Sequence, residues 1–156
     1  MGTFSERNNM NWKRISAVAV ALSMSLASLA IAQPAQAGNS YISQYCKTNM
    51  YVLTYSGSAS DQPMWCRVQH GPAAAFGYTG PADGYPGVNT WKGVQSYLRA
   101  SGVYSGPVDG IPGTNTYKGI QLIARHGGYN GPIDGIPGAN TWRGFDMAIR
   151  VGWFGL

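Results

Sequence analysis

Apolar side chains recur at helical spacing in three stretches of the chain. The three sets are Trp91, Val94 and Leu98; Tyr117, Ile120 and Ala124; and Trp142, Phe145 and Ile149. Each set follows the i, i+3, i+7 spacing of one face of an amphipathic helix. An Asn-Thr pair stands just before each aromatic residue, and either side chain can accept a hydrogen bond from a first helical turn. The pattern predicts three helices that begin at these pairs and are ended by Gly102, Gly127 and Gly152.

A turn-rich segment comes before each predicted helix. The copies are GPADGYPGVNTWKGVQ from Gly80, GPVDGIPGTNTYKGIQ from Gly106 and GPIDGIPGANTWRGFD from Gly131. Asp-Gly and Pro-Gly pairs are typical of tight turns, because glycine adopts positive φ angles that other residues resist. Each copy has one aspartate, Asp83, Asp109 or Asp134, without the alternating ligands of a calcium loop. We expect these carboxylates to hold the turn by accepting hydrogen bonds from its own amides.

The motif has a regular period, and the period reaches further back than the loop. The three aspartates are 26 and 25 residues apart, and Trp65 and Gln69 lie 26 residues before Trp91 and Gln95. A fourth, degenerate copy therefore precedes the three complete ones. Atypical end units are expected in a stacked array, because an end unit has a neighbour on one side only.

The degenerate copy keeps the signals of a helix. Asp61 and Pro63 suit its cap and first turn, and Gly71 with Pro72 suits its end. We predict an all-α fold, a compact array of short helices joined by Gly/Pro-rich turns. Its units are 61–76, 77–102, 103–128 and 129–156.

Each of the three complete units has a glycine one turn inside its helix. These residues are Gly93, Gly119 and Gly144. A glycine inside a helix costs about 1 kcal/mol relative to alanine. We therefore expect a neighbouring backbone or loop to pack closely against each of these positions.

The first 37 residues have the pattern of a secretory signal peptide. An uncharged, mostly apolar run at 15–32 follows Lys13 and Arg14, and AQA at 35–37 is a small-x-small cleavage pattern. Cleavage there would leave a secreted chain of residues 38–156. The alternative is an uncleaved transmembrane anchor, because about 18 apolar residues is the lower limit of a spanning helix.

Both cysteines lie in the exported part of the chain. Cys46 and Cys66 form an even pair, which in an oxidising compartment most simply forms a disulfide. Closing the loop between the two cysteines with a disulfide would stabilise the folded state by about 3 kcal/mol in the chain-entropy model. The bridge would pin the N-terminal segment, residues 38–60, in which YVLTYSG at 51–57 is a candidate short strand.

Composition favours a compact, non-catalytic domain. Gly and Pro are abundant, but aromatic residues make up 12% of the chain, and disordered segments lack so many. Beyond residue 37, eight basic and five acidic side chains leave a net charge of +3, which is no nucleic-acid footprint. That part has two histidines and no glutamate, too few ligands for a zinc site, and its five aspartates are accounted for by turns, a cap and one helix position. The alternative is a cysteine nucleophile with His70 or His126 as its base. We expect no enzyme, no metal and no cofactor.

The repeated motif resembles a known family. DGxxGxxT, matched by Asp83–Thr90, Asp109–Thr116 and Asp134–Thr141, follows a helix with VQ or IQ near its middle. This combination is similar to the peptidoglycan-binding domain found beside bacterial and phage cell-wall hydrolases. The likeness covers residues 65–152, but the family usually has one motif per three-helix domain. The chain departs from the family pattern in the Pro before the second Gly, in the three helix glycines and at Asp146, where the helix would carry Gln.

The resemblance implies a non-catalytic protein that binds peptidoglycan, a polymer of amino sugars cross-linked by short peptides. Such a ligand suits aromatic faces that stack on sugar rings and basic side chains that pair with carboxylates. The candidates are Tyr78, Tyr104, Tyr129, Asn130, Lys92, Lys118 and Arg143. The basic residues also fit solvated helix positions, and the tyrosines fit a structural role equally well.

A second class of function is a secreted protein-protein interaction module, such as an inhibitor or partner of a cell-wall hydrolase. A flat patch of exposed apolar side chains would favour it, and aromatic side chains gathered in a groove would favour a glycan or a stem peptide. Neither function involves nucleic acid or, after signal cleavage, a stable membrane anchor.

Overall fold

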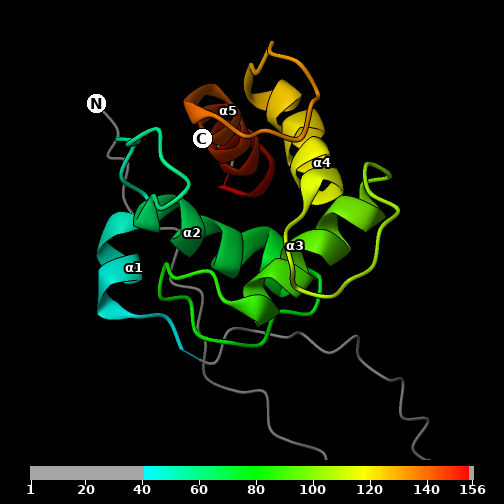
Figure 1. The fold of residues 1–156 in the computed structure, drawn as a ribbon. Helices are drawn as coiled ribbons and strands as arrows, with labels where there is room; N and C mark the ends of the chain where they lie inside the picture. Colours follow the sequence, from blue (N-terminus) through cyan, green and yellow to red (C-terminus); the bar gives the residue numbers. More distant parts are fainter. Residues whose placement is uncertain (1–40, 155–156) are drawn as a thin grey trace, which may run out of the picture. The chain divides into compact units, whose positions relative to one another are not determined.

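Five α-helices account for most of the regular structure in residues 41–154, the part of the chain that the computed structural model describes (Figure 1). They are α1 (Gln44–Asn49), α2 (Gln62–Val68), α3 (Val88–Ala100), α4 (Thr114–Ala124) and α5 (Ala139–Ile149). Shorter turns follow three of them, a π turn at Gln69–Ala73, a 3-10 turn at Arg125–Gly127 and a π turn at Arg150–Phe154. No strand occurs in this range, so the predicted all-α class is confirmed. The expected signal peptide, residues 1–37, lies outside the described residues.

The N-terminal segment differs from its prediction. Cys46 lies in α1, and its disulfide with Cys66 of α2 is formed, with the two Cα atoms 5.4 Å apart. The strand expected at 51–57 is wrong, because this stretch has no regular secondary structure. No second strand pairs with this stretch in the described residues. The backbone amide of Ser56 instead donates to the carboxylate of Asp61 at 2.9 Å.

Helix α2 begins as predicted, but α3, α4 and α5 do not. Asp61 caps α2, accepting a hydrogen bond from the amide of Met64 at 2.8 Å. The other three helices begin one residue before their asparagines, and their N-caps are glycines that make no side-chain hydrogen bond. The expected Asn-Thr caps are wrong because the threonine lies in the third helical position and faces inward. The hydroxyls of Thr90 and Thr116 accept from glutamines of the preceding units at 3.3 and 3.5 Å.

The helix ends follow the prediction only once. Gly102, with φ of 73°, comes directly after the last turn of α3. After α4 the left-handed residue is Gly128, with φ of 90°, and Gly127 lies inside the 3-10 turn. Gly152 lies inside the final π turn. The Gly-Pro pair at 71–72 lies inside the first π turn and does not end the helix there, since a wider turn accommodates a proline that has no amide to donate.

The helix glycines are close-packed, as predicted. A Cβ atom built on Gly93 would lie 2.9 Å from the carbonyl oxygen of Ala73. On Gly144 it would lie 2.7 Å from the carbonyl oxygen of Ala124, and on Gly119 it would lie 3.3 Å from that of Val103. Each helix therefore meets the end of the preceding unit at its glycine.

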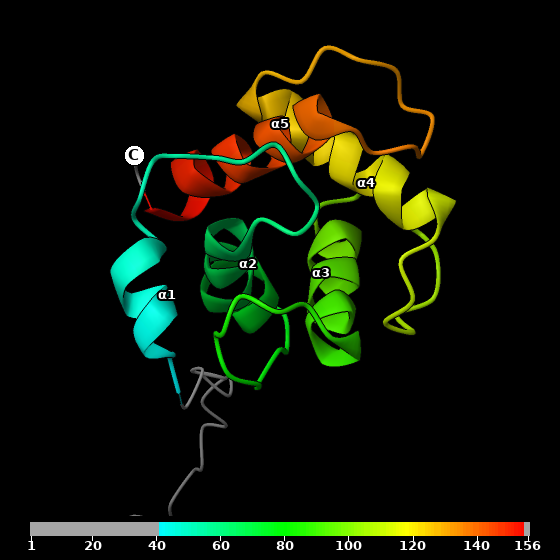
Figure 2. The same ribbon diagram turned by 60° about the vertical axis from the view of Figure 1, so that its left-hand side comes forward.

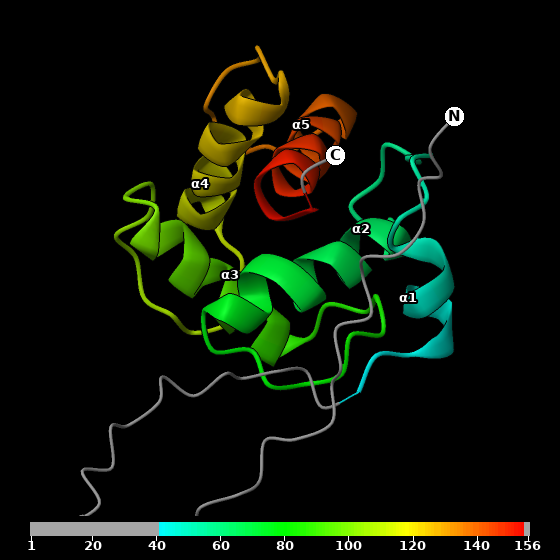
Figure 3. The same ribbon diagram turned by 180° about the vertical axis from the view of Figure 1, so that it is seen from behind.

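Four aromatic rings, one from each unit, make a closed cycle of contacts in the core. The ring centroids of Trp65 and Trp91 are 4.9 Å apart. The centroid distances from Trp91 to Tyr117, from Tyr117 to Trp142 and from Trp142 back to Trp65 are each 6.2 Å. Figure 2 shows α2 beside α3, and Figure 3 shows α4 beside α5. The contact between Trp65 and Trp142 makes the first and last units neighbours, so each end unit has a neighbour on both sides.

The loops complete the same cycle. In the complete units each loop covers the start of the preceding helix. Gly110, for example, sits where a Cβ atom would lie 2.5 Å from the carbonyl oxygen of Val88 at the start of α3. Gly57, also at positive φ and just before the degenerate unit, lies where a Cβ atom would be 3.4 Å from the side chain of Ala139 at the start of α5, an ordinary van der Waals contact. Residues 53–60 thus serve as the loop that closes the array.

Candidate functional site

Buried glutamines fix the repeated loops. Gln95, which is fully buried, reaches from α3 into the next loop. Its Nε2 donates to Oδ1 of Asp109 at 2.9 Å, and its Oε1 accepts from the amide of Gly110 at 2.7 Å. Asp109 also accepts from the amide of Ile111 at 2.9 Å, so it holds its turn in the way that its place in the motif predicts. Equivalent bonds join Gln69 with Asp83 and Gly84, and Gln121 with Asp134 and Gly135.

These bonds stabilise the ionised loop carboxylates. The amide of Ile111 and the side chain of Gln95 hold the pKa of Asp109 below its ordinary value. Gln121 and then the amide of Ile136 lower the pKa of Asp134 in the same way. Hydrogen bonds to a charged form favour that form, so both aspartates stay ionised to lower pH than a free aspartate.

The loop tyrosines that were candidates for ligand stacking support the loops. Tyr78 and Tyr104 are 5% and 9% exposed, so their ring faces are not open to a sugar. Their hydroxyls donate to the carbonyls of the prolines three residues on, at 2.6 and 2.7 Å, and Tyr129, which is half-buried, does the same at 2.8 Å. The spacing Tyr-x-Gly-Pro, present in all three loops, is the signal that sequence reasoning missed.

The basic candidates lie on three different helices, α3, α4 and α5. Lys92 is exposed, and its charge contributes to the lowered pKa of Asp109. Lys118 is half-buried and contributes in the same way to the lowered pKa of Asp134. Arg143 is exposed, and its charge opposes the rise in the pKa of Tyr55 that burial causes. Asn130 is exposed beside Tyr129. Each candidate therefore lies beside its own loop, and the prediction of a ligand role for them stays a prediction.

A hollow recurs between the loop and the first helical turn. In the unit that contains α4 its volume is about 230 Å³, and in the unit that contains α5 it is about 320 Å³. Both are lined by the same positions of the repeat. They are Tyr104, Gly106, Pro107, Asp109, Ile111, Gly113, Thr114, Asn115 and Thr116, and their counterparts Tyr129, Gly131, Pro132, Asp134, Ile136, Gly138, Ala139, Asn140 and Thr141.

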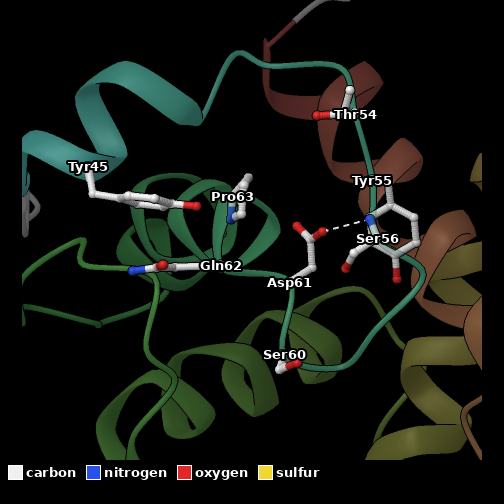
Figure 4. A pocket seen from close by; sticks show the side chains of 8 residues that line it. All are labelled: Tyr45, Thr54, Tyr55, Ser56, Ser60, Asp61, Gln62 and Pro63. Carbon is white, nitrogen blue, oxygen red and sulfur yellow. Dashed lines mark hydrogen bonds between the residues drawn. The ribbon is translucent and has the colours of Figure 1, made fainter.

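A larger hollow, with a volume of about 390 Å³, lies where α1 and residues 54–60 meet the start of α2 (Figure 4). We call it the N-terminal hollow, and its lining is Tyr45, Thr54, Tyr55, Ser56, Ser60, Asp61, Gln62 and Pro63. Asp61 stands four residues before Trp65, where the complete units have glycine. Sequence reasoning missed this site because the loop motif is absent here. The available signals were that aspartate and a tyrosine next to Cys46.

The polar groups of the N-terminal hollow are largely uncharged. Asp61 is 6% exposed, and its two carboxylate oxygens accept from the amides of Met64 and Ser56 at 2.8 and 2.9 Å. Burial, and then the charge of Asp61, raises the pKa of Tyr55 above its ordinary value, so its phenol stays neutral. Tyr45 is 40% exposed at the mouth. No Lys or Arg lines this hollow.

Asp146 differs from its counterparts in the other units. It occupies, in the last unit, the position at which the others have the loop-binding glutamine. Its Oδ1 accepts from Nε of Arg67 at 2.7 Å, and its Oδ2 accepts from Nε of Arg150 at 2.9 Å. All three side chains are at most 4% exposed. Burial lowers the pKa of Arg67, and the charge of Asp146 opposes that shift. The carboxylate therefore ties the last helix to the first unit.

Within residues 41–154, no group of three or more His, Cys, Asp or Glu side chains is placed to hold a metal ion. In the same range no helix is long and apolar enough to span a membrane. Comparison with protein-family models, with curated proteins and with solved structures finds no match.

Proposed function

We propose that the protein is an exported, non-catalytic protein that binds the peptidoglycan of a bacterial cell wall. The observation that carries the proposal is the hollow that recurs at three loop-helix junctions, each lined by side-chain hydroxyl or amide groups. A polymer with a repeating unit can enter more than one hollow at once. Each further contact is then intramolecular, which raises the overall affinity without new kinds of contact.

A binding role, as opposed to catalysis, is supported by what the carboxylates do. The five aspartates between residues 41 and 154 each have structural partners. Asp61 caps α2, the three loop aspartates bind glutamine and backbone amides, and Asp146 binds two arginines. A general acid or base must reach the substrate, and these groups are already engaged.

A location outside the cytoplasm is supported by the disulfide. The Cys46–Cys66 bridge is buried and fits an oxidising compartment. Export itself rests on the signal-peptide pattern of residues 1–37.

Sedimentation with insoluble peptidoglycan sacculi tests the proposal. The oxidised chain of residues 38–156 is expected to sediment with sacculi at low and at high salt. Filling two hollows with Asn115→Trp and Asn140→Trp, both exposed lining positions, should lower retention several-fold. Ala100→Trp is the matched control, because it is exposed at the end of α3 outside the hollows. Recovery of the unmodified protein in the supernatant at both salt levels would rule out wall binding.

One observation favours the second candidate, a protein partner such as a cell-wall hydrolase. Each complete loop has one large apolar side chain at its tip, and Tyr85, Ile111 and Ile136 are 69%, 69% and 76% exposed. Replacing Tyr85 with serine should leave sedimentation with sacculi unchanged if the wall is the ligand, because Tyr85 lines none of the three hollows. Loss of hydrolase binding in that variant, with no binding to sacculi in any form, would establish the second function.

A further inference from the structure

We infer that the N-terminal hollow binds an uncharged, N-acetylated sugar unit of a glycan strand, stacked on Tyr45. The inference rests on the proposed function and names the ligand class at one place. It also separates the glycan from the stem peptide, which the family resemblance leaves undivided.

The shape of the hollow suits one sugar. Figure 4 shows the ring of Tyr45, carried by α1, and the ring of Tyr55 on opposite sides of Asp61 and Pro63. The volume of about 390 Å³ lies near the lower end of the roughly 300–1,000 Å³ of ligand pockets. Tyr45 presents an apolar face and a hydroxyl at the mouth, the combination that suits a ligand with apolar faces and polar edges.

The lining offers hydrogen bonds to hydroxyl and acetamido groups. The hydroxyls of Thr54 and Ser56 make no hydrogen bond to other described residues, and both residues are exposed. A hydroxyl both donates and accepts, as the hydroxyl groups of a sugar also do. Tyr45, Tyr55, Asp61 and Pro63 line the same hollow as these two hydroxyls.

The charges around the hollow disfavour both ends of a stem peptide. A carboxylate would meet Asp61 with no Lys or Arg in the lining to balance it. An amine would gain little from Asp61, because that carboxylate is 6% exposed and both oxygens already accept backbone hydrogen bonds. An uncharged group is therefore the ligand that this lining fits.

The disulfide fixes the stacking face before the ligand arrives. Cys46, next to Tyr45, is fully buried and bonded to Cys66 in α2. Holding a contact group in its bound place reduces the ordering cost of binding. Reduction of the disulfide should therefore weaken the binding of sugar.

The test is an NMR titration of the oxidised chain of residues 38–156 with two soluble probes, a β-1,4-linked N-acetylglucosamine tetramer and a free stem tetrapeptide. The tetramer should shift the amide signals of residues 54–56, and the peptide should leave them unchanged. Tyr45→Ala should weaken tetramer binding about five- to tenfold, the value of one aromatic contact. Tyr85→Ala, which removes a tyrosine 69% exposed on another loop, is the matched control and should bind as the unmodified protein does.

Each outcome decides a different point. Equal tetramer binding by Tyr45→Ala and the unmodified protein would overturn the inference, and so would shifts at residues 54–56 with the peptide alone. Sedimentation with sacculi without any tetramer binding would overturn the inference and leave the proposed function standing. Failure of both experiments would overturn both.

Discussion

Single buried glutamines set the conformation of whole loops. Gln95 has no exposed surface. Its side-chain Nε2 donates to Asp109 and to the carbonyl of Ile111, and its Oε1 accepts from the backbone amide of Gly110. An apolar side chain of similar size would fill the space but would leave these loop groups without partners. The cost of a buried polar group without a partner is about 1–3 kcal/mol.

Gln95→Leu is therefore expected to lower the free energy of unfolding by about 2–4 kcal/mol, since more than one partner is lost. Urea unfolding of the oxidised protein, followed by circular dichroism, measures this change. Ser96→Ala, at the next helical position, is the control and should stay within about 0.5 kcal/mol of the unmodified protein. A loss below 1 kcal/mol for Gln95→Leu would mean that water replaces the glutamine.

Two of the loop aspartates, Asp109 and Asp134, make stability depend on acid pH. Their pKa values are lower in the folded chain than in the unfolded one. Their contribution to the free energy of unfolding is therefore fully present above the unfolded-state pKa of about 3.9. It is lost as the pH falls through the folded values. Urea midpoints should decline from pH 5 to pH 3, and Asp109→Asn with Asp134→Asn should flatten that decline. An identical slope in the double variant would show that other groups cause the acid sensitivity.

At the scale of helices, local sequence predicts positions well and partners poorly. The apolar faces of α3, α4 and α5 and the cap of α2 follow from spacing and residue type alone. The Asn-Thr caps fail because Thr90 and Thr116 bind a glutamine 21 residues earlier, and no local rule contains such a contact. The N-terminal hollow was missed for the same reason. It forms only when α1, the loop and α2 come together.

The helix glycines are where local propensity and packing disagree most. Gly144→Ala should gain about 1 kcal/mol of helix propensity but place a Cβ atom 2.7 Å from the carbonyl oxygen of Ala124. Overpacking costs about 1–3 kcal/mol, more where the obstacle is backbone, so we expect a net loss of stability. Thermal unfolding measures it. Gly138→Ala, at the N-cap of the same helix, has open space and φ of −102°, and it should cost less than about 1 kcal/mol. A stabilised Gly144→Ala would contradict the close packing.

Across residues 41–154 as a whole, the contact between the first and last units decides how the protein unfolds. An open array of repeats unfolds from its ends, because each unit depends only on its neighbours. Here the aromatic cycle, the contact of Gly57 with Ala139 and the bonds between Asp146 and Arg67 give both end units a second neighbour. We therefore expect the units to unfold together in one transition.

Asp146→Ala tests this join most directly, because it leaves two arginines buried without their common partner. Removing one partner of a buried ion pair costs about 3–5 kcal/mol. Arg143→Ala, exposed one turn earlier on α5, is the control. In the unmodified protein, tryptophan fluorescence and circular dichroism should report the same urea midpoint. In Asp146→Ala the two midpoints should separate, because the aromatic cycle opens before the helices of the middle units are lost. Coincident midpoints with a loss below 1 kcal/mol would show that the aromatic contacts alone close the array.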